Sequence, residues 1–452
     1  MIRPKSALWL KTLAGAAALS LTLAACGSSE EPEDTATGTD TATEETTDAG
    51  AGEDFTNDEC ASDSTSADTF KVGGILPLTG NLAFLGPPEV AGVGLAVSDI
   101  NAAGGVGEAD ACHLILDSGD ATDASVANNS AQQAIQGEVS LVVGAASSSV
   151  TLNIVDAITD ASIVQISPAN TAVALSGYDD FYFRTAPPDG IQGDALGNLI
   201  LQDGFQRVAF IVFNDAYGTG LRDVVQQTIE AAGGEITYGA TGAGQEFPPA
   251  QTSFSAEVSG ALATNPDAII ILAFDETRAI VPELQNAGWD MSKVYLTDGN
   301  TSSYGEDFPA GTLEGAKGTI PGNDPESGFK DRLSGWYESA EGEPLTDFSY
   351  GAESYDAVVL AALAAVKGGA TDPVTVQANL AAVSGANGGT ECATYEECVA
   401  ALDAGEEIDY NGPSGIGPFD DENDPSSAFV GIYQYDAENN ISLISTVEGS
   451  KG

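Results

Sequence analysis

The chain has 452 residues, 42% of them hydrophobic, which is too long for one small core and suits two domains or two lobes. Its 14 Lys and Arg residues face 68 Asp and Glu residues, for a formal net charge of −54. A surface this acidic repels nucleic acid and anionic membranes, so we expect neither as a direct partner.

The N-terminus reads as an export signal. Arg3, Lys5 and Lys11 precede the apolar run LAGAAALSLTLAAC, which is short for a membrane-spanning helix and suits a signal-peptide core. The run ends in LAACG, which resembles a bacterial lipobox, and this resemblance implies that Cys26 is lipidated after removal of residues 1–25. The alternative is a plain signal peptide with a chance cysteine. Lipidation predicts a protein anchored to the outer face of the cell membrane.

Residues 27–68 contain no Lys or Arg and almost no large apolar side chain. Such a segment cannot bury enough surface to fold, so we expect residues 26–68 to form a disordered acidic tether. A random coil of roughly 40 residues spans about 35 Å.

Four cysteines remain after Cys26, an even number that suggests disulfides in an exported chain. Cys392 and Cys398 would close a small local loop, and Cys60 and Cys112 would attach the end of the tether to the first domain. A zinc site fits poorly, because the spacing is wrong and the chain has a single histidine.

From residue 70 on, short apolar runs rich in β-branched residues alternate with segments of helical spacing. One series of apolar runs precedes residue 170 and a second begins near residue 207. Continuous apolar strands that alternate with helices indicate parallel sheets covered on both faces, and two series indicate two α/β lobes. Ligands of such sheets bind beyond the carboxyl ends of the strands.

Catalytic and cofactor motifs fit poorly. A serine nucleophile needs a base, and the one histidine, His113, sits beside Cys112, while GAASSS lacks the spacing of a nucleophile elbow. The sequence has no Walker A motif, YGTGLRD lacks the third glycine of a dinucleotide fingerprint, and FDDENDP does not fit a calcium loop. We therefore expect no catalytic residue, no cofactor, no metal and no enzymatic activity.

Three consecutive serines, Ser147 to Ser149, follow an apolar run and precede a helical pattern. One serine suffices to cap a helix, which is the simplest interpretation. The other hydroxyls are left over, and a helix N-terminus at the carboxyl end of a strand suits a small anion such as a carboxylate. We expect capping together with carboxylate binding.

Several spaced motifs resemble the branched-chain amino-acid (Leu/Ile/Val) binding proteins of ABC transporters. They are GGILPLTGNLAFLGPPEVAGVGLAVSDINAAGGV, VVGAASSSVTLNIVDAITDASIVQISPANT, YFRTAPPDGIQG, AFIVFNDAYGTG and YLTDG, in the family's order. The resemblance covers roughly residues 70–450. It implies two doubly wound parallel-sheet lobes joined by a three-strand hinge, with the ligand in the cleft between them. The implied lobes are residues 69–187 plus 322–417 and residues 188–321 plus 418–452.

The resemblance also implies a ligand-binding site. The carboxylate-binding residues fall on Ser147 or Ser148 and Thr171, the stacking ring on Tyr217, and the acid for the ligand's ammonium on Asp298. Three further positions depart from the leucine-binding relatives and leave the side-chain preference open: Phe274 for a covering tyrosine, Leu85 with Phe84 beside it for a pocket aromatic, and Asn170 for a small residue. Asp298 as a turn residue, Tyr217 as a packing residue and Phe274 as a core residue stay open as alternatives.

The resemblance implies a monomeric binding protein that captures a small amino acid by closing its two lobes and delivers it to ABC permease subunits. The alternatives are a protein for an amide, urea or another small metabolite, or a ligand-sensing receptor of the same fold.

Overall fold

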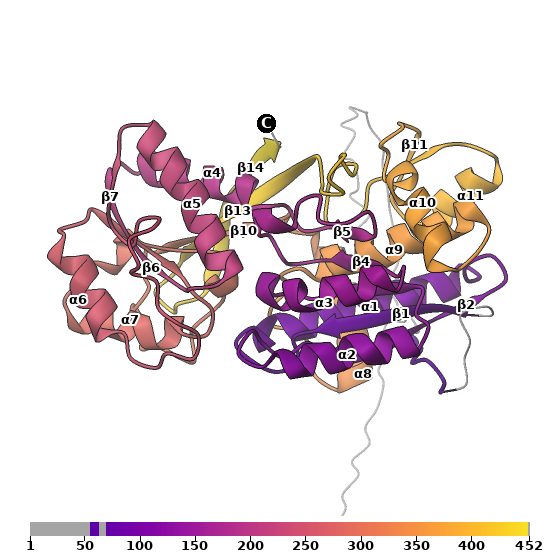
Figure 1. Ribbon diagram of the computed structural model, residues 1–452, viewed down its shortest axis with the longest axis horizontal. Coiled ribbons are helices and arrows are strands. Elements are labelled where there is room, and N and C mark those ends of the chain that lie inside the picture. The colour runs from indigo at the N-terminus through magenta and orange to yellow at the C-terminus, as the bar shows by residue number, and fades with distance from the viewer. Residues whose placement is uncertain (1–54, 63–68, 451–452) are drawn as a thin grey trace, which may run out of the picture. The chain divides into compact units, whose positions relative to one another are not determined.

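The computed structural model describes residues 55–62 and 69–450. Two large sheets, each with its own helices, form what we call the first and second lobes (Figure 1). The expected signal peptide, Cys26 and most of the expected tether lie outside the described residues.

The first lobe is built on a parallel five-stranded sheet of order β2-β1-β3-β4-β5. Its strands are β1 (Thr69–Leu76), β2 (Asp110–Asp117), β3 (Leu141–Gly144), β4 (Val164–Ser167) and β5 (Tyr182–Arg184). Its helices are α1 (Gly86–Ala102), α2 (Ala124–Gln136), α3 (Ser148–Asp160), α8 (Ser327–Glu341), α9 (Gly351–Gly368), α10 (Pro373–Val383) and α11 (Tyr395–Asp403). A small parallel pair, β11 (Thr390–Cys392) and β12 (Ile408–Tyr410), lies beside α10 and α11.

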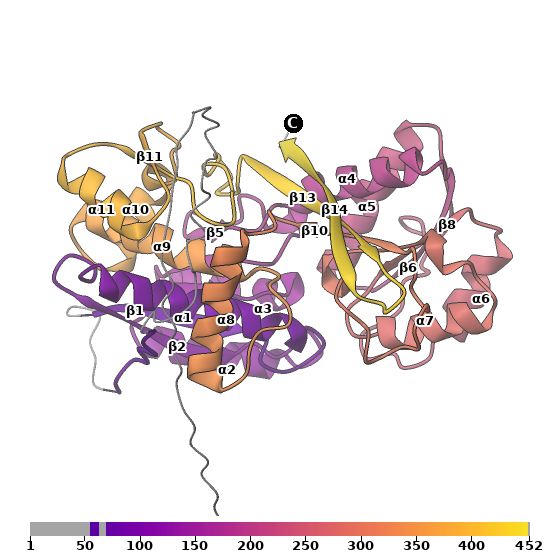
Figure 2. The ribbon, with the colours of Figure 1, turned by 180° about the vertical axis from the view of Figure 1, so that it is seen from behind.

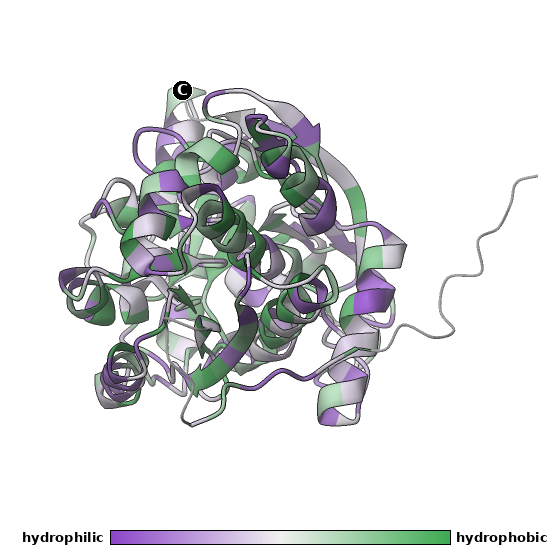
Figure 3. Cartoon of the chain, turned by 90° about the vertical axis from the view of Figure 1, so that its right-hand side faces the viewer, coloured by the Kyte–Doolittle hydropathy of each residue, from purple (hydrophilic) through white to green (hydrophobic). Residues whose placement is uncertain are grey.

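Side-chain alternation along the strands explains why helices cover both faces of this sheet. In β3, Leu141 and Val143 pack in the cluster that contains α1 and α9, whereas Val142 packs in the cluster of α2 and α3. Successive strand side chains point to opposite faces, so an all-apolar strand needs cover on both. Figure 3 shows the hydrophobic residues gathered in the inner elements and the hydrophilic ones toward the outer loops and helices.

The second lobe is built on a seven-stranded sheet of order β14-β13-β10-β9-β8-β6-β7. The parallel strands are β6 (Arg207–Val212), β7 (Glu235–Tyr238), β8 (Ala268–Leu272), β9 (Val294–Leu296) and β10 (Lys317–Pro321). Its helices are α4 (Asp189–Gln202), α5 (Ala216–Ala231), α6 (Ser255–Ala263) and α7 (Thr277–Asn286). The hairpin of β13 (Ser427–Tyr435) and β14 (Ile441–Ser450), prominent in Figure 2, adds two antiparallel strands.

The prediction of two α/β parallel-sheet lobes is confirmed, with the antiparallel hairpin as an addition to the second sheet. The chain passes between the lobes three times: between β5 and α4, between β10 and α8, and between β12 and β13. The domain limits given above remain predictions.

Part of the segment assigned to a disordered tether is folded. Residues 55–62 lie along the outer edge of the first lobe, where Glu59 forms a parallel bridge with His113 and the indole of Trp336 donates a hydrogen bond of 3.0 Å to the Thr56 carbonyl. Composition did not reveal this contact because the packing partners come from β2 and α8. Both expected disulfides are present, Cys60–Cys112 and Cys392–Cys398, with Cα–Cα distances of 4.9 and 5.3 Å.

Within the described ranges, no single helix is long and apolar enough to cross a membrane. Helices α9 and α10 meet the length and composition criteria only as a pair, across a bend of 104°.

Candidate functional site

A small cavity lies where loops of the two lobes meet, and it contains the expected site residues other than Phe84. Its walls are Leu82, Leu85, Ala146, Ser147, Ser148, Ala169, Asn170, Thr171, Tyr217, Phe274, Asp298, Gly299 and Tyr350. Phe84 is half-buried and packs against the neighbouring apolar cluster instead. The carboxyl ends of β3, β4, β8 and β9 lead into these loops, as expected for parallel sheets.

The three serines have three different roles. Ser147 is the N-cap of α3, and its hydroxyl accepts a hydrogen bond from the Val150 amide. Ser148 faces the cavity; its Oγ accepts a hydrogen bond from the Ala172 amide at 3.3 Å and donates to no acceptor among the described residues. Capping therefore occupies one serine and leaves the Ser148 hydroxyl proton available.

Ser149 connects the two lobes. Its hydroxyl donates to Asp215 Oδ2 at 3.2 Å and accepts from the Ala216 amide at 3.1 Å, both at the start of α5. Burial raises the pKa of Asp215 to about 6. The start of α3 thus contacts the start of α5 beside the cavity.

The turn into α3 needs glycine at residue 144. A Cβ atom there would lie 2.1 Å from the carbonyl oxygen of Ile75, and the backbone has φ of +120°. Only glycine fits this close approach without strain. The turn brings Ala146 and the serines to the end of the first sheet.

The loop after β4 contributes a hydroxyl without a partner. Thr171 is fully buried and lines the cavity, yet its Oγ1 forms no hydrogen bond among the described residues. It lies near the Asp189 carboxyl, without the geometry of a hydrogen bond, and burial raises the pKa of that carboxyl well above its usual range. A buried polar group without a partner calls for an explanation, and a bound ligand supplies one.

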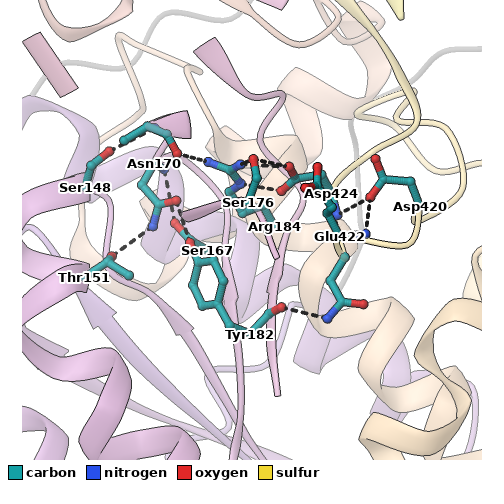
Figure 4. Close-up of polar contacts among 12 residues, drawn as sticks. Ser148, Thr151, Ser167, Asn170, Ser176, Tyr182, Arg184, Asp420, Glu422 and Asp424 are labelled. Atoms are coloured by element: carbon teal, nitrogen blue, oxygen red, sulfur yellow. Dashed lines mark hydrogen bonds and ion pairs between the residues drawn. The ribbon is translucent and has the colours of Figure 1, made fainter. Parts of the chain in front are cut away.

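Asn170 has a supporting role in this geometry. Its Nδ2 donates to the Ala145 carbonyl at 3.2 Å and to Thr151 Oγ1 at 2.9 Å, and its Oδ1 accepts from the Tyr182 hydroxyl at 2.6 Å. These bonds tie the loops after β3 and β4 together inside the first lobe (Figure 4).

A buried ion pair also holds the loop after β4 in place, through the Ala172 carbonyl. Arg184 and Asp424 pair through two bonds, Nε to Oδ1 at 2.6 Å and Nη2 to Oδ2 at 2.9 Å, and both side chains are buried. Arg184 Nη1 also donates to the Ala172 carbonyl at 2.9 Å, while the Ala172 amide donates to Ser148. Figure 4 shows this continuous path from Ser148 to Asp424, at the third passage between the lobes.

Two stacked rings form the second-lobe wall. Tyr217 lies in the first turn of α5, and its ring stacks on Phe274 with centroids 5.4 Å apart and an interplanar angle of 17°. Phe274 follows β8 and also packs against Phe213 in a T-shaped arrangement. With Leu82 and Leu85 opposite, they give the cavity an apolar side.

Asp298 is the acidic group of the cavity, and neutral donors surround it. Its Oδ1 accepts from the Tyr217 hydroxyl at 2.7 Å and from Gln192 Nε2 at 2.9 Å, and its Oδ2 accepts from the Tyr350 hydroxyl at 2.8 Å. No Lys or Arg pairs with it among the described residues. Burial raises the pKa of Asp298 because its negative charge is uncompensated.

The cavity has a volume of about 20 Å³ and holds little more than one water molecule. An additional lobe-to-lobe hydrogen bond, from Asn81 Nδ2 to Glu276 Oε1 at 2.9 Å, lies beside it. A ligand of amino-acid size therefore enters only if the lobes separate or the lining side chains move.

Sequence reasoning missed two polar residues, Tyr350 and Gln192. Tyr350 precedes α9 in the left-handed conformation with φ of +61°, and Gln192 lies in α4. Nothing in their local sequence points to Asp298, because the contacts depend on how distant segments pack. Within residues 55–62 and 69–450, no group of three or more His, Cys, Asp or Glu side chains could hold a metal ion.

The fold and site define a two-lobe solute-binding protein, with polar and apolar groups of both lobes around one small cavity. The chain belongs to the periplasmic binding protein family, whose model matches residues 69–397. The resemblance to Leu/Ile/Val-binding proteins of the type I fold is confirmed.

Two curated relatives illustrate the likeness. A leucine-, isoleucine-, valine-, threonine- and alanine-binding protein of Pseudomonas aeruginosa is 35% identical over 176 residues, 38% of this chain and 46% of that protein. The chain thus spans about half the length of this relative. The chemotactic signal transduction system substrate-binding protein BasB of Halobacterium salinarum is 26% identical over 361 residues, 76% of this chain and 82% of that protein.

Solved structures share the fold. A substrate-binding protein LivJ of Streptococcus pneumoniae, in complex with isoleucine, has a TM-score of 0.65 at 21% identity, with 85% of this chain and 100% of that chain covered. A solute-binding protein of Rhodopseudomonas palustris HaA2, in complex with p-hydroxybenzoic acid, has a TM-score of 0.66 at 16% identity, with 85% and 98% covered. Similar backbones thus hold different small carboxylates.

Proposed function

We propose that this protein captures a small α-amino acid with an apolar side chain outside the cell and delivers it to the permease of an ABC importer. The observation that carries the proposal is the pairing, across one cavity, of unsatisfied hydroxyl donors on the first lobe with an uncompensated carboxylate on the second. It acts by binding alone and is not an enzyme.

The first lobe supplies the contacts for a carboxylate. Thr171 Oγ1 has no partner among the described residues, and the proton of the Ser148 hydroxyl is available beside it. Both lie next to the start of α3, where the helix dipole favours a negative charge. A ligand carboxylate satisfies the buried Thr171 hydroxyl, which is costly to leave unpaired.

The second lobe supplies the contact for an ammonium. Asp298 already accepts three hydrogen bonds from neutral groups, and a carboxylate has about four acceptor positions. An ammonium on the ligand adds the positive charge that the buried site lacks.

The apolar wall supports a hydrocarbon side chain on the ligand. Leu82 and Leu85 of the first lobe and Phe274 of the second line the cavity and are all buried. The binding of isoleucine by the similar LivJ of Streptococcus pneumoniae supports a branched-chain ligand.

A screen tests this proposal. The purified protein is titrated by calorimetry with leucine, isoleucine, valine, alanine and threonine, then with urea, small amides, benzoate and 4-hydroxybenzoate. We expect the protein to bind at least one apolar amino acid tightly and to bind none of the uncharged amides. Preference for a benzoate or an amide over every amino acid would contradict it.

We further propose that lipidated Cys26 anchors the protein to the outer face of the membrane. The support is the lipobox-like LAACG sequence after an apolar signal core. Cys26→Ser should release the protein into the medium or leave it unprocessed. An unchanged membrane-bound fraction after detergent-free washing would contradict the anchor.

Ligand sensing is a second candidate function, favoured by the similarity to BasB of Halobacterium salinarum over most of both chains. Deletion of the gene separates the two functions. Loss of amino-acid uptake with normal taxis supports transport, and loss of taxis with normal uptake supports sensing.

A further inference from the structure

A second cavity, of about 250 Å³, lies where the chain passes between the lobes. We call it the hinge pocket. It is bounded by the end of β10 and the loop after it, by α8, by the start of α9, and by β13 and β14. Tyr350 is its one residue in common with the central cavity.

Acidic groups outnumber basic ones around the hinge pocket. Asp324, Asp347 and Glu353 line it, and Lys330 is its single basic residue. Lys330 pairs with Asp324 at 2.5 Å. Asp347 Oδ1 accepts a hydrogen bond from the Ser349 amide at 2.8 Å, which leaves Glu353 as the carboxylate to be explained.

Glu353 is the decisive group. It is only 3% exposed, lines the pocket, and receives no side-chain hydrogen bond or ion pair within the part of the chain that the structure describes. Its Oε1 lies against Gly322, where an added Cβ would come within 2.1 Å, so glycine leaves the space that the carboxylate occupies. Glu89, which is fully buried and forms no side-chain hydrogen bond among the described residues, is a second acidic group near Glu353. Burial raises the pKa of both carboxyl groups well above the usual range.

Aromatic rings complete the lining. Tyr433, Tyr350 and Phe348 all border the pocket, and Lys330 Nζ already lies 5.8 Å from the centre of the Phe348 ring. Tyr433 lines the same pocket as Asp324, Asp347 and Glu353, and burial followed by the charges of these carboxylates raises the pKa of its hydroxyl. Aromatic faces attract cations, and quaternary ammonium groups use such surroundings.

We propose that the hinge pocket is a second binding site, for a small organic cation, with Glu353 as its charge partner and the three rings as its walls. An organic cation fits better than a metal ion because the described residues contain no group of acidic, His or Cys side chains suited to a metal. In this structure the hinge pocket has a volume of about 250 Å³ and the central cavity about 20 Å³. The hinge pocket therefore has room for a small molecule while the central cavity is nearly closed.

The test uses two cations with matched neutral molecules. Calorimetric titrations of the purified protein compare choline with 3,3-dimethylbutan-1-ol, and putrescine with butane-1,4-diol. At least one cation should bind at least about tenfold more tightly than its neutral counterpart, the effect of one charge-assisted contact. If neither cation binds, or if each neutral molecule binds as well as its cation, the proposal is overturned.

Two substitutions locate the site. Glu353→Gln keeps the side-chain shape and should weaken the cation at least about tenfold, while Asp347→Asn, at the pocket wall, should weaken it less. Asp298→Asn, in the central cavity, should weaken the cation far less than Glu353→Gln does, since Asp298 does not line the hinge pocket and touches it only through Tyr350. Loss of the cation in Asp298→Asn but not in Glu353→Gln would assign it to the central cavity and overturn the hinge pocket. Failure of this proposal would leave the proposed amino-acid binding standing, because that binding is tested by the separate titrations with leucine and the other amino acids.

Discussion

Asp298→Asn should weaken the amino-acid ligand and leave the unliganded protein as stable as before or more stable. In the structure Asp298 accepts hydrogen bonds from Tyr217, Gln192 and Tyr350, and asparagine has nearly the same shape. The substitution removes a buried charge that has no cation beside it. The same charge is the expected partner of the ligand's ammonium.

The two effects have opposite signs and different sizes. A buried ammonium left without its partner costs about 3–5 kcal/mol, which is a loss of about two to three orders of magnitude in affinity. For the unliganded protein, the folded pKa of Asp298 lies above its unfolded value. Its contribution to stability is therefore fully present below about pH 4 and is lost as the pH rises through the folded pKa. Asparagine does not ionise, so the Asp298→Asn protein should not lose this stability as the pH rises.

Calorimetry gives the affinity, and urea denaturation without ligand gives the stability. Asp160→Asn is the matched control, because Asp160 is exposed at the end of α3 and should change neither quantity. Affinity in Asp298→Asn equal to that of the wild type would refute the role of Asp298. A large decrease in the free energy of unfolding without ligand would refute the claim that the Asp298 carboxylate is a buried charge without a compensating cation.

Two other predictions concern stability. Asp215→Asn should raise the free energy of unfolding by up to about 3 kcal/mol at about pH 8 and should leave it unchanged at about pH 4. The reason is that the folded pKa of Asp215, about 6, exceeds the ordinary aspartate pKa of 3.8, so its carboxylate costs stability only at the higher pH. Equal changes in the free energy of unfolding by urea at both pH values would contradict this. Serine at both Cys60 and Cys112, which close a loop of 52 residues, should cost about 4 kcal/mol, against about 2 kcal/mol for Cys392 and Cys398 with a separation of 6. If thermal denaturation shows that the two double-serine variants lose equal stability, or that the Cys392 and Cys398 variant loses more, then loop length is not the cause.

The parallel strands and the loops after them could be predicted from the sequence because their signals are local. An apolar run such as residues 141–144 has the length and composition of a buried strand, and the serines that follow it mark a helix start. The family motifs singled out Thr171, Tyr217 and Asp298, and the structure brings all three to one cavity. Whether they bind the ligand stays a prediction.

The contacts that depend on distant packing could not be predicted. Tyr350 reaches Asp298 across 52 positions of the chain, from a backbone conformation that tyrosine seldom adopts. Asn170 was expected in the cavity wall and is there, but its side-chain hydrogen bonds go to the interior of the first lobe. The disulfide Cys60–Cys112 was expected at the edge of the acidic segment, but the hydrogen bond from Trp336 that holds residues 55–62 on the first lobe was not, because Trp336 lies 280 positions further along the chain.

The central claim is that the cavity holds both charged groups of an α-amino acid, and one calorimetric series tests it most directly. The purified protein is titrated with L-leucine, with 4-methylpentanoate, which lacks the ammonium, and with isopentylamine, which lacks the carboxylate. The account predicts that each analogue binds at least about 100-fold more weakly than leucine, because each leaves one buried partner unpaired. Binding of 4-methylpentanoate as tight as that of leucine would contradict the role of Asp298, and equal binding of isopentylamine would contradict that of Ser148 and Thr171.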